Sequence, residues 1–171
     1  MQEVREQAAG ERGVYTKTHV SSGQEVYSIP ESLWLTPGRL RAHTAGAAAL
    51  KWAKDKRPSW AKEQHDLEVL LITVLLLLEK VKPSSVWATY FVSLPWETTV
   101  LPLRWSPEEL QDQLRGTPPQ VEIETRQKEL RETYSSLRKY CGGAAAAQFT
   151  KACPSPWLPR FLGLVHECLM K

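Results

Sequence analysis

The residues best suited to chemistry lie near the start of the chain, where Gly10 and Gly13 enclose the pair Glu11 and Arg12 just before Val14. Glycine has no Cβ, so the backbone around these positions can approach a ligand closely. We predict that the backbone of Glu11, Arg12, Gly13 and Val14 forms one wall of a ligand site. The alternative is structural, a strand that merely needs Gly13 where it begins, because a short glycine motif alone is a weak signal.

A second set of reactive side chains, Cys153, His166 and Cys168, lies near the end of the chain. No pair has Cys-x-x-Cys spacing and a proline-rich segment follows the first cysteine, so no metal site is predicted. A Cys/His hydrolase would also need an orienting group and an oxyanion site, for which this segment offers no residues. Residues 160–170 carry apolar side chains at helical spacing, which is typical of an amphipathic helix and makes them a candidate docking surface.

The glycine-bearing stretch opens a segment with the alternation of β-strands. Alternate residues from 14 to 20 share one strand face, residues 21–24 have turn chemistry, and a second short run covers residues 26–29. Pro30 then removes a donor from any ladder. We therefore predict a β-hairpin, formed by residues 14–20 and 26–29, within a β unit of residues 10–36.

Beyond this unit the pattern becomes helical. Residues 45–53 are rich in alanine, and a longer helix is predicted to begin with Asp66 as N-cap and to end before Pro83. Apolar residues from Leu67 to Leu78 surround this helix instead of forming one stripe. Neighbours should therefore pack on most of its sides, which makes it the best candidate for the core.

Two further helices are predicted in the second half of the chain. Ser106 is a suitable N-cap and Pro107 suits the first helical position of a short helix that should stop by Gly116. A longer helix near residues 121–140 has Leu130, Tyr134 and Leu137 on its apolar face. The charged residues of this helix, including Arg126, are predicted to face outward.

Several motifs in these segments resemble those of a known family. Residues 10–30 resemble the opening of a SET methyltransferase domain, and Ser84 to Pro95 resembles the S-x-W-x-x-Y-[LF]-x-x-L-P signature of its rubisco large-subunit methyltransferase-like branch, which includes the actin-histidine methyltransferases. Residues 105–110 and 114–117 resemble the W-s-x-E-E-L and L-x-G-T elements of that branch. The resemblance covers residues 8–140. Within the signature, the cluster that identifies the branch is expected to pack into the core: Trp87, Tyr90, Leu94 and Pro95.

The resemblance implies a protein-lysine N-methyltransferase that uses S-adenosylmethionine, with Glu11, Arg12, Gly13 and Val14 as one wall of the cofactor site and a protein as substrate. It also implies an Asn-His pair and a catalytic tyrosine in the second half of the domain. The chain has no asparagine, and its five tyrosines precede the place expected for the catalytic one. We therefore assign no catalytic residue and expect a truncated, catalytically incomplete form. The alternative is a non-enzymatic protein-interaction module derived from the SET insert, with residues 67–78 among its binding elements.

The predicted fold class is α+β, an incomplete domain in which the short β-hairpin unit of a SET domain, residues 8–40, precedes a mainly α-helical insert, residues 41–140. After residue 140 the composition changes to glycine and alanine and then to proline. Relatives would continue here into an F-x-W-A helix, of which only Phe149 and Ala152 match. Residues 141–171 are therefore predicted to be a divergent, non-homologous tail.

Composition limits the kinds of partner. The net charge of the 171-residue chain is only +3, with cations scattered among acids, so nucleic acid is not predicted as a partner. The longest apolar run, residues 69–78, is shorter than the roughly 20 residues that cross a bilayer as a helix, so no membrane is predicted either. The seven tryptophans are predicted to be packing residues and the three cysteines to be reduced. No signal or transit peptide is visible, which leaves cytoplasm, nucleus or, in a longer form, chloroplast open.

Overall fold

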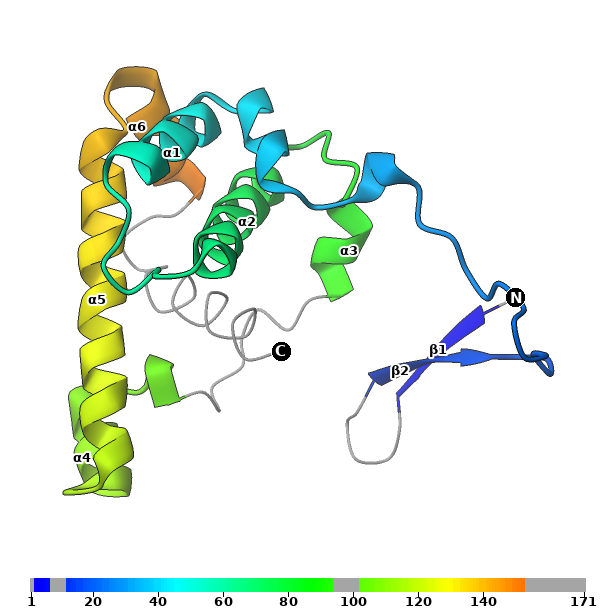
Figure 1. Ribbon diagram of the computed structural model, residues 1–171, viewed down its shortest axis with the longest axis horizontal. Coiled ribbons are helices and arrows are strands. Elements are labelled where there is room, and N and C mark those ends of the chain that lie inside the picture. The colour runs from blue at the N-terminus through cyan, green and yellow to red at the C-terminus, as the bar shows by residue number, and fades with distance from the viewer. Residues whose placement is uncertain (1, 7–11, 94–101, 153–171) are drawn as a thin grey trace. The chain divides into compact units, whose positions relative to one another are not determined.

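The computed structural model describes residues 2–6, 12–93 and 102–152. Its contacts divide the chain into two compact units, Met1–Trp34 and Leu35–Lys171. The first contains a short β ribbon and the second contains the α-helices (Figure 1). The predicted domain limits at residues 40 and 140 stay predictions, but the division between compact units falls after Trp34.

The ribbon of the first unit pairs different segments from those predicted. Strand β1, Gln2–Glu6, runs antiparallel to β2, Arg12–Thr16, with Val4 opposite Val14. The predicted hairpin of residues 14–20 and 26–29 is therefore wrong. The expected turn does form, since Gly23 has φ 79° and the Gln24 N–H donates to the Ser21 carbonyl at 3.1 Å, but residues 26–29 join no ladder. The N-terminal segment supplies an equally short partner strand that the sequence analysis had not considered.

The fold class is all-α, and the predicted α+β class with the β-hairpin unit of a SET domain is wrong. Helices make up most of the described residues, and β1 and β2 are the only strands among them. The physical reason is that the short run after the turn has no buried face, since Val26, Tyr27 and Ile29 are exposed. Burial of one face is what specifies the register of a strand, and this run lacks it.

In the second unit, a 3₁₀ segment leads directly into the first long helix. This segment, η2, spans Pro37–Ala42, and α1 spans Thr44–Asp55, which confirms the alanine-rich helix. The two approach so closely that a Cβ added to Gly46 of α1 would lie 2.2 Å from the carbonyl oxygen of Leu40. Glycine at this position therefore sets the distance between the two elements.

Helix α2, Gln64–Lys80, is the centre of this unit, as predicted. Its residues from Leu67 to Leu78 are buried on nearly every side, and α1, α3, α6 and η2 contact it. The predicted N-cap is wrong by three residues. Glu63 is the N-cap, and Asp66 is the third helical residue, whose carboxylate accepts a hydrogen bond from the Glu63 N–H at 3.2 Å to complete a capping box.

Of the remaining helices, α4 lies beside the first turns of α5, away from α2 (Figure 1). Helix α3, Ala88–Ser93, follows Trp87, which packs with Phe91 and Leu76 in a small second cluster. Helix α4, Pro107–Leu114, follows the 3₁₀ segment η3, Pro102–Arg104, and packs against α5. Helices α5, Pro118–Tyr140, and α6, Gly143–Ala152, complete the main core. No helix in the described ranges is long and apolar enough to span a membrane.

The two helices of the second half begin and pack as predicted. Ser106 caps α4 and Pro107 is its first residue. Leu130, Tyr134 and Leu137 of α5 are buried. Helix α6 also belongs to this core, because Phe149 is fully buried and its ring lies 5.7 Å from that of Tyr134.

A buried pair of polar side chains joins the start of α1 to the end of α2. Nε2 of His43, the N-cap of α1, lies 2.8 Å from Oε1 of Glu79, and both side chains are 4 % exposed. Burial acts to raise the pKa of Glu79, but the neighbouring Ser85 hydroxyl, His43 and the Lys82 ammonium oppose it, so that the pKa lies below its ordinary value of 4.5. The second oxygen, Oε2, has no hydrogen-bond partner among the described residues.

We predict that Gly46→Ala destabilises the second unit by at least about 2 kcal/mol, because the new methyl group would collide with the backbone of η2 and force overpacking. Urea denaturation followed by circular dichroism measures the loss. The control is Gly142→Ala, since a Cβ at Gly142 meets nothing within 4 Å. Equal stabilities for the two variants would show that the close approach of η2 and α1 is absent in solution.

We also predict an acid-dependent stability term from Glu79. Its pKa is lower in the folded chain than the ordinary value of 4.5. Its contribution to the free energy of unfolding is therefore complete above about pH 4.5 and is lost as the pH falls through the pKa of the folded chain. The difference in unfolding free energy between the wild type and Glu79→Gln should therefore shrink as the pH is lowered from 6 to about 3. Glu122→Gln, on the exposed side of α5, is the control. A difference that grows on acidification would contradict the assignment.

Candidate functional site

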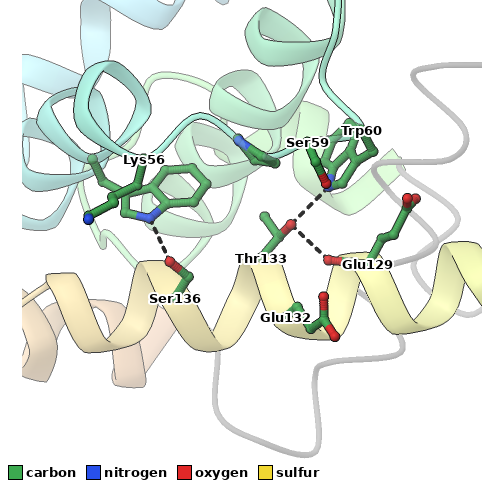
Figure 2. A pocket seen from close by; sticks show the side chains of 9 residues that line it. Lys56, Ser59, Trp60, Glu129, Glu132, Thr133 and Ser136 are labelled. Carbon is green, nitrogen blue, oxygen red and sulfur yellow. Dashed lines mark hydrogen bonds between the residues drawn. The ribbon is translucent and has the colours of Figure 1, made fainter.

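A notch of about 150 Å³ lies between α5 and the segment that follows α1 (Figure 2). Pro58 and Ser59 form one rim, and residues 129–136 of α5 form the opposite wall. It has room for a few water molecules or one small side chain. Its lining is Trp52, Lys56, Pro58, Ser59, Trp60, Glu129, Glu132, Thr133 and Ser136.

Two indole hydrogen bonds fix the walls of this notch. Trp52 Nε1 donates to Ser136 Oγ at 3.0 Å, and Trp60 Nε1 donates to Thr133 Oγ1 at 2.8 Å. The Thr133 hydroxyl donates in turn to the Glu129 carbonyl at 2.8 Å, as Figure 2 shows. Residues three and four apart share one face of a helix, so α5 can present both hydroxyls to the two indoles. Each bond satisfies an indole N–H that burial would otherwise leave unpaired.

The charges around the notch are mixed. The lining carries two acids, Glu129 and Glu132, and one base, Lys56. Arg126 contacts two residues of this lining. Its guanidinium stacks 4.2 Å from the centre of the Trp60 ring and lies 3.5 Å from Glu129 Oε2. Arg126 was predicted to face outward, but it is half-buried. The reason is that its alkyl stem and its charged group can both pack on the indole ring of Trp60.

This arrangement can bind, but its chemistry offers little for catalysis. The lining contains neither histidine nor cysteine, and both of its glutamates are partly or fully open to solvent. Hydroxyls and carboxylates at the rim can accept hydrogen bonds from a small donor group. The main role of the residues around the notch is therefore structural: their hydrogen bonds connect α1 and the segment that follows it to α5.

The predicted wall of the cofactor site lies in the first unit, Met1–Trp34. Arg12, Gly13 and Val14 belong to β2, where Arg12 faces Glu6 and Gly13 faces Arg5 of β1. Glu11 lies outside the described residues. Arg12 and Gly13 precede the strand predicted to begin at Val14, and the structure instead includes all three in a paired strand.

The residues of the signature and of the tail were the other predicted positions, and only some of them lie within the described ranges. Trp87 is buried and Tyr90 is 45 % exposed, whereas Leu94 and Pro95 lie outside the described residues. So do the three tail residues Cys153, His166 and Cys168 and the predicted amphipathic helix. Burial raises the pKa of the Cys141 thiol, which favours the unreactive protonated form. The described part of the chain holds no group of three side chains suited to a metal ion.

The notch was not predicted from the sequence, because all seven tryptophans were expected to be packing residues. Thr133 and Ser136 were available as a signal, since they interrupt a helix face otherwise marked by Leu130, Tyr134 and Leu137. A hydroxyl near the apolar face of a helix needs a hydrogen-bond partner. An indole N–H is a side-chain donor that needs an acceptor when it is buried, so the two groups suit each other.

Comparisons with family models, curated proteins and solved structures give no match to this chain. The resemblance to the SET methyltransferases therefore depends on the motif residues themselves.

We predict that Thr133→Val destabilises the chain by about 1–3 kcal/mol, because the buried N–H of Trp60 loses its acceptor. Urea denaturation measures the change. Thr125→Val is a matched control on the same helix, since the Thr125 hydroxyl also donates to a carbonyl four residues earlier but is exposed and meets no indole. In a Trp60→Phe background the cost of Thr133→Val should fall; an undiminished cost would show that the indole is not the partner that matters.

Proposed function

We propose that this chain is a relative of the rubisco-branch SET protein-lysine methyltransferases and that its helical unit is the insert that borders the protein-substrate cleft in that family. The observation that carries the proposal is that most residues of the W-s-x-E-E-L and L-x-G-T elements occupy positions where the fold needs those residue types. In the S-x-W-x-x-Y signature, Trp87 is buried, whereas Tyr90 is 45 % exposed.

The W-s-x-E-E-L element has a clear structural role at the start of α4. Ser106 Oγ accepts from the Glu109 N–H at 3.2 Å, and Glu109 Oε2 accepts from the Ser106 N–H at 2.7 Å. This reciprocal capping box requires a hydroxyl and a carboxylate at this spacing. Leu110, the last residue of the element, is fully buried.

The L-x-G-T element forms the turn from α4 to α5. Gly116 has φ 73°, a conformation that favours glycine. The Thr117 hydroxyl donates to the carbonyl of Leu114 at 2.7 Å, and Thr117 is the N-cap of α5. Gly116 and Thr117 are therefore suited to this turn by backbone conformation and side chain, whereas Leu114 contributes a backbone acceptor.

The incomplete F-x-W-A element supports the same interpretation. Its matching residues, Phe149 and Ala152, are buried, while the intervening Thr150 and Lys151 are exposed. Similarity has been kept where the side chains pack in the core. We infer that the relationship extends beyond residue 140, through the end of α6.

For the methyl donor we propose a contact with the backbone of Arg12, Gly13 and Val14. Each strand of a two-stranded ribbon leaves one edge of N–H and C=O groups unpaired, and such an edge can bind the amino and carboxylate groups of an amino-acid moiety. S-adenosylmethionine would supply an electrophilic methyl group there. The chain's own residues would bind and orient it; with no asparagine in the sequence, no residue is assigned to the transfer step.

The alternative is a non-enzymatic interaction module. The helix formed by residues 67–78 is buried on nearly every side, so that within this helix only the first turns, at Leu67 and Leu71, border a groove that a partner could enter. This groove, whose rim carries Arg41, Lys54 and Arg57, is the surface that favours this alternative.

The proposal predicts saturable heat on titration of the whole chain with S-adenosylmethionine in a calorimeter. Gly13→Trp should weaken this binding about tenfold or more, because the indole covers the strand edge; tenfold corresponds to about 1.4 kcal/mol. Thr18→Trp, at an exposed position outside the ribbon, is the control. A sample with intact helical circular dichroism that releases no heat would refute the donor site, as would equal affinities of the two variants.

A further inference from the structure

A groove of about 470 Å³ opens on the second unit between η2, α1 and the first turns of α2. We call it the basic groove. Its floor is apolar and consists of Leu50, Ala53, Leu67 and Leu71. Ala53, Leu67 and Leu71 are at most 8 % exposed and Leu50 is half-buried, so the floor is part of the core and is held in shape by it. The volume lies within the range of pre-formed ligand pockets.

The rim of the basic groove carries three cations and one acid. Arg41 and Lys54 are exposed and lie on different elements, η2 and α1. Arg57 donates from Nε to the Ala61 carbonyl at 2.6 Å and from Nη2 to the Lys62 carbonyl at 2.8 Å. These acceptors are neutral carbonyls, and within the described ranges no ion pair joins Arg57 to an acid.

The single acid of the rim is Glu68, which accepts a hydrogen bond from Gln64 at 3.0 Å. The groove therefore keeps an excess of positive charge. The surrounding sequence has the same sign of charge, because residues 35–71, which include the whole lining, contain seven cations and four acids. These cations are Arg39, Arg41, Lys51, Lys54, Lys56, Arg57 and Lys62.

We propose that the basic groove binds an acidic segment of a partner protein, with one large apolar side chain on the floor and flanking carboxylates on Arg41 and Lys54. A protein segment is favoured over nucleic acid because the floor is aliphatic and offers neither aromatic rings for base stacking nor polar groups for base edges. It is favoured over a lipid surface because the apolar residues are recessed below the charged rim instead of projecting from it. The proposal needs only the second unit and does not depend on binding of a methyl donor.

Fluorescence anisotropy with the whole chain tests this proposal. The probe is a labelled synthetic peptide with a central Leu-Phe pair flanked on each side by Asp and Glu. We expect saturable binding that weakens as salt is raised from 50 to 300 mM, because exposed charges are screened. The double reversal Arg41→Glu/Lys54→Glu should weaken binding at least tenfold. The matched control Lys128→Glu/Lys139→Glu changes the net charge equally on the exposed face of α5 and should leave the affinity within twofold.

A second peptide, with the Leu-Phe pair replaced by Ser-Ser, tests the apolar floor without altering the protein. We expect it to bind at least tenfold more weakly. Equal binding of the two peptides, or equal losses in the two charge-reversal variants, would overturn the proposal in favour of non-specific attraction. Stronger competition by a single-stranded oligonucleotide or by anionic phosphatidylserine vesicles than by unlabelled peptide would overturn it too.

Discussion

The burial of α2 is the constraint on which the rest of the helical unit depends. Leu70, Val74, Leu75, Leu77 and Leu78 are each at most 1 % exposed, although they point in different directions around the helix. Full burial of such a side chain contributes about 1.5–3 kcal/mol. An apolar helix of this kind is stable in water only when neighbours cover every side. Helices α1, α3 and α6 and the segment η2 meet that demand.

The polar groups of this core are placed where covering elements must be held in register. His43 and Glu79 join the start of α1 to the end of α2, and the indoles of Trp52 and Trp60 bind hydroxyls of α5. Buried groups of this kind are costly unless they are paired, so each pair favours one arrangement of the helices over others. The notch and the basic groove lie at the margins of these contacts. Both are therefore formed by rigid helices before any ligand arrives.

The helices were predictable because their signals are local. Ser106 and Pro107 mark the start of α4, and the apolar run from Leu67 to Leu78 predicts a helix whatever lies around it. The β ribbon was not predictable in the same way. An alternating stretch such as residues 12–16 shows that a strand can form, but contacts with residues distant in sequence decide which strand pairs with it. Here the partner is Gln2–Glu6 and not residues 26–29.

The sequence by itself determined the approximate positions of α1, α2, α4 and α5, the identity of the central helix and the motifs that resemble a methyltransferase insert. These follow from periodicity and capping, which act over a few residues. Only the tertiary structure decided which strand partners β2, which hydroxyls receive the indoles, and that Arg41, Lys54 and Arg57 gather around one apolar floor. The physical reason is that burial and pairing join groups from separate elements, and a single sequence does not say which elements will meet.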